Sequence, residues 1–175
     1  GSFPGGLVHR TDRGEPSVFS TGRIMLGLVV AYDQTSDAEF LQTAAGAARW
    51  LCDDLNEPAG IWLSVDHPAF QPSHLTVVCW AMLEVWQRTR EARIRDQAMR
   101  ALQIIAGRRL PNGAVDDWGL HADRPAITDT IADTLRGMWE CGRILGDGGR
   151  QYIDVASQAA ALLRELLGRT ILRWV

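Results

Sequence analysis

The residues best suited to chemistry in this 175-residue chain are acids, histidines and tryptophans that lie between its apolar segments. The sharpest local group is Asp116-Asp117-Trp118, in which two carboxylates that could transfer protons adjoin an indole face that could pack on a ligand. We predict catalytic roles for Asp117 and Asp116, at most one of which faces a substrate because adjacent side chains diverge. The alternative is a turn in which the aspartates hydrogen-bond their own backbone.

Further candidates lie in similar segments or at the first residues of apolar helices. His121 is a third catalytic candidate, because imidazole titrates near neutral pH. The predicted ligand contacts are Trp118, Trp62, Arg23, His67, His9 and Asp129. Arg23 suits a carboxylate ligand because a guanidinium group can donate two parallel hydrogen bonds. An ion pair with an acid in a neighbouring link is the alternative for Arg23.

The sequence leaves open the roles of two pairs of acidic residues. Asp129 and Asp133 are one helical turn apart and could share a proton or hold a metal ion. The structural interpretation is stronger, because acids in a first turn offset the helix dipole and Arg136 would neutralise Asp133. Glu84 and Glu140 occupy equivalent mid-helix positions, where they would either enter a central lumen or lie on a solvated edge.

Composition excludes several classes of function. All 18 basic residues are arginines, so a Schiff-base lysine and the lysine of a phosphate-binding P-loop are excluded. The formal net charge of -3 gives no basic surface for nucleic acid, and no apolar run is long enough for a membrane span. Three widely spaced cysteines without a CxxC motif indicate free thiols rather than a zinc site. We therefore expect a cytoplasmic protein with no metal and no cofactor.

An internal repeat positions these residues. Three segments that begin at Leu26, Trp80 and Arg136 align with one another. Small residues recur where helices could approach closely, namely Gly27, Ala81 and Gly137, and acids recur at expected helix starts, namely Asp37, Glu91 and Asp147. The following helices align as well, with Ala44, Ala98 and Ala156 in one column and Ala48, Leu102 and Ala160 in another.

The repeat predicts a single all-α domain over residues 1–175, made of three helical hairpins (about 21–73, 74–127 and 128–168). The expected helices cover about 21–35, 38–55, 74–89, 91–108, 128–145 and 149–168. The first helix of each hairpin is apolar nearly all round and is expected to form an inner layer. The second has one apolar stripe, as in Ile94, Ala98, Ala101, Leu102 and Ile105, and is expected to form an outer layer.

Two long links join an outer helix to the next inner helix, at about 56–73 and 109–127. Each opens with a turn signal that ends in Gly60 or Gly113, followed by the apolar residues Ile61-Trp62-Leu63 or Ala114-Val115. Long links in a compact repeat fold commonly carry function. The first residues resemble the end of such a link without its preceding helix, which suggests a piece of a longer array.

These alternating helices and glycine-rich links, together with Thr21-Gly22-Arg23-Ile24-Met25-Leu26-Gly27-Leu28, resemble the α/α-toroid superfamily. That superfamily includes six-hairpin sugar enzymes, terpenoid cyclases and protein prenyltransferases. The resemblance implies a ring of about six hairpins with its cavity at the N-terminal ends of the inner helices. Three hairpins would make half a ring, whose apolar inner faces the rest of the chain or a second copy should cover.

The resemblance leaves three functions open. The first is a carbohydrate-active hydrolase, lyase or epimerase in which Trp62 and Trp118 pack on a small-molecule sugar substrate. The second is a cyclase or prenyltransferase relative, although Ala114 and Leu120 stand where the D-x-D-D and D-D-x-x-D patterns need acids. The third is a non-catalytic helical-repeat module that binds a partner through its open face.

Overall fold

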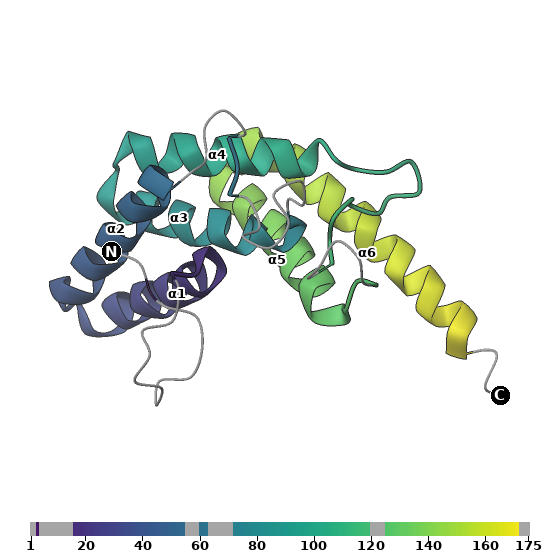
Figure 1. Cartoon of the computed structure of the whole chain (residues 1–175), viewed down its shortest axis with the longest axis horizontal. Helices are drawn as coiled ribbons and strands as arrows, with labels where there is room; N and C mark the ends of the chain where they lie inside the picture. Colours follow the sequence, from purple (N-terminus) through teal and green to yellow (C-terminus); the bar gives the residue numbers. More distant parts are fainter. Residues whose placement is uncertain (1–2, 4–15, 55–59, 63–71, 120–124, 172–175) are drawn as a thin grey trace.

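The protein folds into six α-helices and two short 3-10 turns within the part of the chain that the structure describes (Figure 1). The computed structural model describes residues 3, 16–54, 60–62, 72–119 and 125–171. The elements are α1 (Val18–Thr35), α2 (Ala38–Asp54), η1 (Ser73–Leu75), α3 (Thr76–Thr89), α4 (Ala92–Ala106), α5 (Thr128–Leu145), η2 (Gly146–Gly149) and α6 (Arg150–Ile171). The all-α prediction is confirmed, and each expected helix is found within three residues of its predicted ends.

The helix ends follow from local chemistry. Ser17 precedes α1, and its side-chain oxygen accepts a hydrogen bond from the Ser20 backbone N–H. Asp37 precedes α2 and accepts from the Glu39 N–H at 2.9 Å, as the repeated acid predicts. Glu91 stands at the equivalent position before α4 but makes no capping bond, because its carboxylate binds Arg49 instead. The aligned acidic residues of the repeat therefore mark where helices begin, but only some of their side chains form a capping hydrogen bond.

The helix α3 lies at the centre of the fold and contacts α1 on one side and α5 on the other. Each of these helices also packs against its own hairpin partner, so that α2 lies on α1, α4 on α3 and α6 on α5. Figure 1 shows α4 crossing above α3, and the C-terminal half of α6 extending beyond the other helices. In the described part of the chain, no helix combines the length and apolar character needed to cross a bilayer.

Close approach of α3 to its neighbours depends on two glycines. A Cβ on Gly137 of α5 would lie 2.4 Å from the carbonyl carbon of Thr76 at the start of α3. Gly22 has the equivalent role on α1, because a Cβ at this position would lie 2.9 Å from the Val78 Cγ2 atom. The expected close contact at Gly27 is wrong, because that residue is exposed and nothing lies within 4 Å of an added Cβ.

The second helices of the hairpins bury one stripe each. All five predicted core residues of α4 are fully buried. In α6 the aligned Ala156 is buried as predicted, whereas Ala160 is exposed. The three cysteines are buried and free, and burial raises the pKa of Cys79 to about 12 and that of Cys52 to about 11. These thiols are part of the core packing.

Candidate functional site

The N-terminal ends of α1, α3 and α5 meet at one end of the fold. Phe19 of α1 and His74 of η1 pack edge to face, with ring centroids 5.1 Å apart. The Thr76 hydroxyl donates a hydrogen bond to the Thr134 carbonyl of α5 at 3.0 Å. Arg23 of α1 binds Asp133 of α5. We call Phe19, Arg23, His74, Asp129 and Asp133 the N-terminal cluster, which lies where the resemblance to α/α toroids would place a ligand cavity.

Arg23 is the most accessible cation of the N-terminal cluster. Its side chain is 52% exposed, and Nη1 alone donates to both carboxylate oxygens of Asp133, at 2.9 and 3.2 Å. The guanidinium group also lies 5.7 Å from the centroid of the Phe19 ring. Among the described residues, no hydrogen-bond partner is found for its Nε or Nη2. An acid thus pairs with Arg23, as the alternative anticipated, but it belongs to α5 rather than to a link.

Asp133 lies in a more buried position, with 13% of its side chain exposed. Burial raises the pKa of Asp133, Arg23 opposes this shift, and the nearby negative charge of Asp129 adds to it. The expected partner Arg136 is wrong, because Arg136 binds Glu140 on its own helix at 2.8 Å. Asp129 itself lies exposed in the first turn of α5, where it offsets the helix dipole.

His74 is a buried histidine that joins α3 to the second link. Its Nδ1 lies 3.3 Å from the Gly119 carbonyl oxygen. A carbonyl only accepts hydrogen bonds, so Nδ1 carries the proton when the ring is neutral. Burial lowers the pKa of His74, against the opposing effects of this hydrogen bond and of Asp129. The ring is therefore neutral at pH 7 and helps to position the link.

Asp116 and Asp117 close a turn that is fastened to the start of α3. The Asp117 carbonyl accepts from the Ser73 N–H at 2.9 Å, and the Asp116 carbonyl accepts from the Ser73 hydroxyl. Asp117 has a left-handed backbone (φ 54°), and its N–H donates to the Asp116 carboxylate. Its own carboxylate binds the guanidinium group of Arg108 at 3.0 Å. Asp116 thus makes the local backbone contact that the turn interpretation predicts, whereas the Asp117 carboxylate pairs with the Arg108 side chain.

The two predicted aromatic platforms differ. Trp62 is only 2% exposed, and its indole N–H donates to the Leu51 carbonyl at 3.0 Å. The prediction of a ligand platform at Trp62 is therefore wrong, because the ring is enclosed in the core. Trp118 is partly exposed and packs against the core from the second link. It remains a candidate for ligand packing.

Three predicted site residues, His121, His67 and His9, lie outside the described residues. The other candidates split between two places. Arg23 and Asp129 belong to the N-terminal cluster, whereas Asp116 and Asp117 lie at the turn that Ser73 joins to the same end of α3.

The accessible face of α1, α3 and α5 continues from the N-terminal cluster along all three helices. Ile24 and Val30 of α1 and Trp139 of α5 are exposed apolar residues of these helices, with Val30 59% exposed. The central part is charged rather than apolar. Glu84 of α3 binds Arg88 at 2.8 Å and lies 3.8 Å from Arg143, which binds Glu140 at 2.8 Å.

This charged network gives Glu84 and Glu140 a definite role. Both lie on the accessible face, each with 13% of the side chain exposed. Burial would raise the pKa of Glu140, but Arg143 and Arg136 outweigh it and hold that pKa below its usual range. The arginines therefore keep the Glu140 carboxylate ionised and hold both side chains in place, which favours a binding surface over proton transfer.

Sequence reasoning missed Phe19 and Arg108 as contributors to the region. Phe19 lies in the first turn of α1, so its position in the repeat was the signal available. Arg108 gave no signal, because an arginine at the end of an amphipathic helix is normally solvated.

Among the described residues, no three His, Cys, Asp or Glu side chains gather closely enough to bind a metal ion. No family model, curated protein or solved structure gives a significant match to this chain.

Proposed function

We propose that this chain is a carbohydrate-binding α/α-hairpin repeat protein that holds an acidic sugar at the N-terminal cluster. The proposal rests on the environment of the Arg23 guanidinium group. Asp133 and Phe19 hold its guanidinium group half exposed, while Nε and Nη2 have no hydrogen-bond partner among the described residues. These two nitrogens form one edge of the group, which matches the two oxygens of a uronic acid carboxylate.

In this proposal the three hairpins of the chain form part of an α/α toroid that has about six hairpins in all. Equivalent contacts in successive hairpins support a regular repeat. Gly60 of the first link lies against Arg100 of α4, and Gly113 of the second link lies against Gln158 of α6. Arg100 and Gln158 each follow an aligned alanine, Ala98 or Ala156, by two residues. Further hairpins would continue this pattern and surround the N-terminal cluster.

Catalysis by Asp117, Asp116 or His121 stays a prediction. Hydrolysis, lyase chemistry or epimerisation by Asp117 would require its carboxylate to leave Arg108. Binding at Arg23 requires no such rearrangement, so the proposal rests on binding alone.

The test compares two arginines with similar surroundings. Arg23 and Arg49 are 52% and 54% exposed, and each binds one carboxylate, of Asp133 and Glu91 respectively. Replacement by lysine keeps the charge and removes the paired donor geometry. We expect Arg23→Lys to weaken binding of a glucuronate oligosaccharide about tenfold or more, as loss of a charged hydrogen bond implies. Titration calorimetry provides the measurement.

Arg49→Lys is the matched control and should leave the affinity unchanged. Equal affinities for the wild type and Arg23→Lys, or the absence of binding to any uronate oligosaccharide, would contradict the proposal. A neutral oligosaccharide that binds as tightly as the uronate would remove the role given to the carboxylate.

A second candidate function is a helical-repeat module that binds a partner through the face of α1, α3 and α5. Exposed Val30 on α1 and Trp139 on α5, which is 46% exposed, favour it, because buried apolar surface drives association. Light scattering tests this candidate. Self-association that Val30→Arg abolishes would support it, and a monomer at all concentrations would count against a second copy as the partner.

A further inference from the structure

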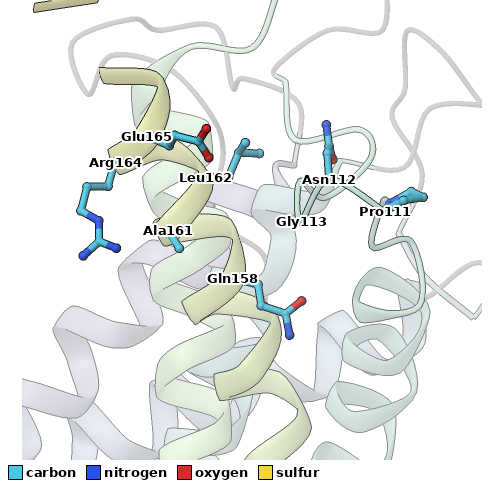
Figure 2. Close-up of a pocket in the computed structure, with 8 residues that line it drawn as sticks. All are labelled: Pro111, Asn112, Gly113, Gln158, Ala161, Leu162, Arg164 and Glu165. Carbon is cyan, nitrogen blue, oxygen red and sulfur yellow. The ribbon is translucent and has the colours of Figure 1, made fainter. Parts of the chain in front are cut away.

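Neighbouring hairpins are joined mainly through their inner helices α1, α3 and α5. The outer layer is looser, because two hollows of about 610 and 560 Å³ lie between α6 and α4 with its following turn. We call these hollows the α4–α6 cleft, and Figure 2 shows Gln158, Leu162 and Glu165 on the side of α6 that faces the turn at 111–113. The contacts that hold one hairpin against the next therefore lie in the inner layer.

The contacts between inner helices repeat in register. Gly22 of α1 lies against Val78 of α3, since an added Cβ would be 2.9 Å from the Val78 Cγ2 atom. The equivalent residues one repeat later are Thr76 and Thr134, and the Thr76 hydroxyl donates a hydrogen bond to the Thr134 carbonyl at 3.0 Å. Each inner helix thus uses one position to meet the next inner helix and a position two residues later to meet the previous one.

At the two free edges of the inner layer, these contact positions are exposed. One repeat further, the pair would be Ala132 on α5, which is exposed, and Ile24 on α1, which is 38% exposed. Gly27 lies one turn beyond Ile24 on the edge of α1, and its equivalents Ala81 and Gly137 are buried. Among the described residues, nothing lies within 4 Å of a Cβ added to Gly27. The two edges thus retain the small and apolar residues of a buried helix contact.

The sizes of the residues at the two edges complement each other. Val29 of α1 and Leu83 of α3 lie two turns beyond the position that meets the next inner helix, and both are buried. Their equivalent on α5 is Trp139, which is 46% exposed. The edge of α1 has the small residues Gly27 and Ala31 one turn apart. A large indole on one edge and small residues on the other permit close packing, and covering the indole favours association.

The polar ends of the two edges also match. Asp33 of α1 binds Arg88 of α3. The equivalent residues at the free edges are Arg143 on α5 and Gln34 on α1. Arg143 has a side chain that is 61% exposed, and a guanidinium group can donate a hydrogen bond to a side-chain amide oxygen. A contact between the two edges would therefore replace an acid–arginine pair by an arginine–amide pair.

We propose that two copies of this chain associate edge to edge, with α5 of each copy packed against α1 of the other. Arg23 of α1 reaches Asp133 of α5 past the N-terminal end of α3, so the three inner helices curve round their accessible face. A second copy related by a two-fold axis would continue this curve and close it into a ring of six inner helices. Both free edges of each copy are then covered at once, by the residues that match them in the repeat.

The test places a charged side chain at the contact position of α5. Sedimentation velocity should give the wild type twice the 19.3 kDa mass of one chain. Ala132 is exposed, so Ala132→Arg leaves the packing of a single copy intact, but it buries an unpaired charge in the dimer. We expect the dissociation constant of the dimer to rise about tenfold or more. Ala92→Arg, the same substitution at an exposed position of the central outer helix α4, is the control and should leave the dimer unchanged.

Gly27→Glu, on the edge of α1, should weaken the dimer as well and provides a second variant if Ala132→Arg does not fold by circular dichroism. The double variant Gly27→Glu with Ala132→Arg should restore the dimer, because each contact then joins a glutamate to an arginine. The proposal is overturned if the wild type is a single chain or an open series of oligomers, if Ala132→Arg keeps the dimer, or if the double variant does not restore it. Because Gly27 and Ala132 lie outside the N-terminal cluster, these outcomes are separate from those for sugar binding.

Discussion

The interfaces α2/α4 and α4/α6 are built from equivalent helix positions, yet ion pairs bridge the first and a cleft opens at the second. Between α2 and α4, two arginine–carboxylate pairs bridge the helices, and the link residues Ile61 and Trp62 are fully enclosed. Between α4 and α6, amides and Gly107 face a cleft, and the link supplies the smaller residues Ala114 and Val115.

This difference shows that the hairpin repeat does not by itself decide where a binding surface forms. The same backbone arrangement accommodates both interfaces, because helices α2, α4 and α6 are each held mainly by their own hairpin partners. Side chains at a few matched positions then close or open the space between neighbouring hairpins. Three pairs of substitutions at matched positions test this difference, from the largest expected effect to the smallest.

The largest effect is expected at Trp62, whose ring fills the first interface. Trp62→Ala should lower the free energy of unfolding by about 3–5 kcal/mol, because it leaves a cavity and removes the partner of the Leu51 carbonyl. Val115→Ala, at the equivalent link position, should lower it by about 1.5 kcal/mol, since it removes only two methylene-sized groups. Urea unfolding measures both. Equal losses would show that the two links contribute alike to packing.

An intermediate effect is expected at the glycines that begin the two apolar link segments. Gly113 has φ +89°, and an added Cβ would lie 3.3 Å from the Gln158 carbonyl oxygen. Gly60 has φ +72°, but its nearest neighbour would be the flexible Arg100 side chain. Gly113→Ala should therefore lower the free energy of unfolding by about 1–2 kcal/mol, and Gly60→Ala by somewhat less.

Gly148→Ala serves as the control for these two variants, because nothing lies within 4 Å of its added Cβ and its φ is not positive. It should have almost no effect. A larger loss from Gly60→Ala than from Gly113→Ala would show that Arg100 cannot move aside.

The smallest effect concerns pH. The hydrogen bond from Arg49 holds the pKa of Glu91 below its ordinary value of 4.5. A lowered folded pKa contributes stability that is present above the unfolded pKa and is lost as pH falls through the folded pKa. Arg49→Gln should therefore reduce the free energy of unfolding by less than about 1 kcal/mol at pH 7, because the pair is largely exposed, and by a smaller amount at about pH 3, below the ordinary pKa of the glutamate.

Gln103→Ala, at the position equivalent to Arg49, should cause no change that depends on pH between these limits, because an amide does not titrate. Urea is the denaturant of choice, since guanidinium salt would screen the ion pair. A pH-independent loss in Arg49→Gln would show that the arginine acts through packing rather than charge.

Much of the fold follows from sequence periodicity. The helix α4 shows why, because its apolar residues recur at helical spacing and all five are buried. Glycine spacing was less informative, since Gly27 is exposed whereas Gly22 makes the close contact with α3. A small residue permits close packing at a helix face, but only the rotation of the helix decides which small residue faces its neighbour.

The position of the candidate site could be predicted from the sequence more readily than the contacts that its side chains make. Arg23 was singled out as an anion contact, and the structure places it half exposed beside Phe19. Its partner Asp133 lies on α5, and no local pattern relates two side chains so distant in sequence. Trp62 looked like an exposed ring because it follows a turn, but the link folds inward and encloses it.

The sequence alone determined the helices, their order in hairpins and the absence of lysine chemistry, because these depend on residue types and on local spacing. Tertiary structure decided which charges are paired and which surfaces stay open. The residues Arg108 and Asp117 illustrate the reason, since their ion pair depends on how a turn folds back on the end of α4. The α4–α6 cleft depends in the same way on how two helices distant in sequence face one another.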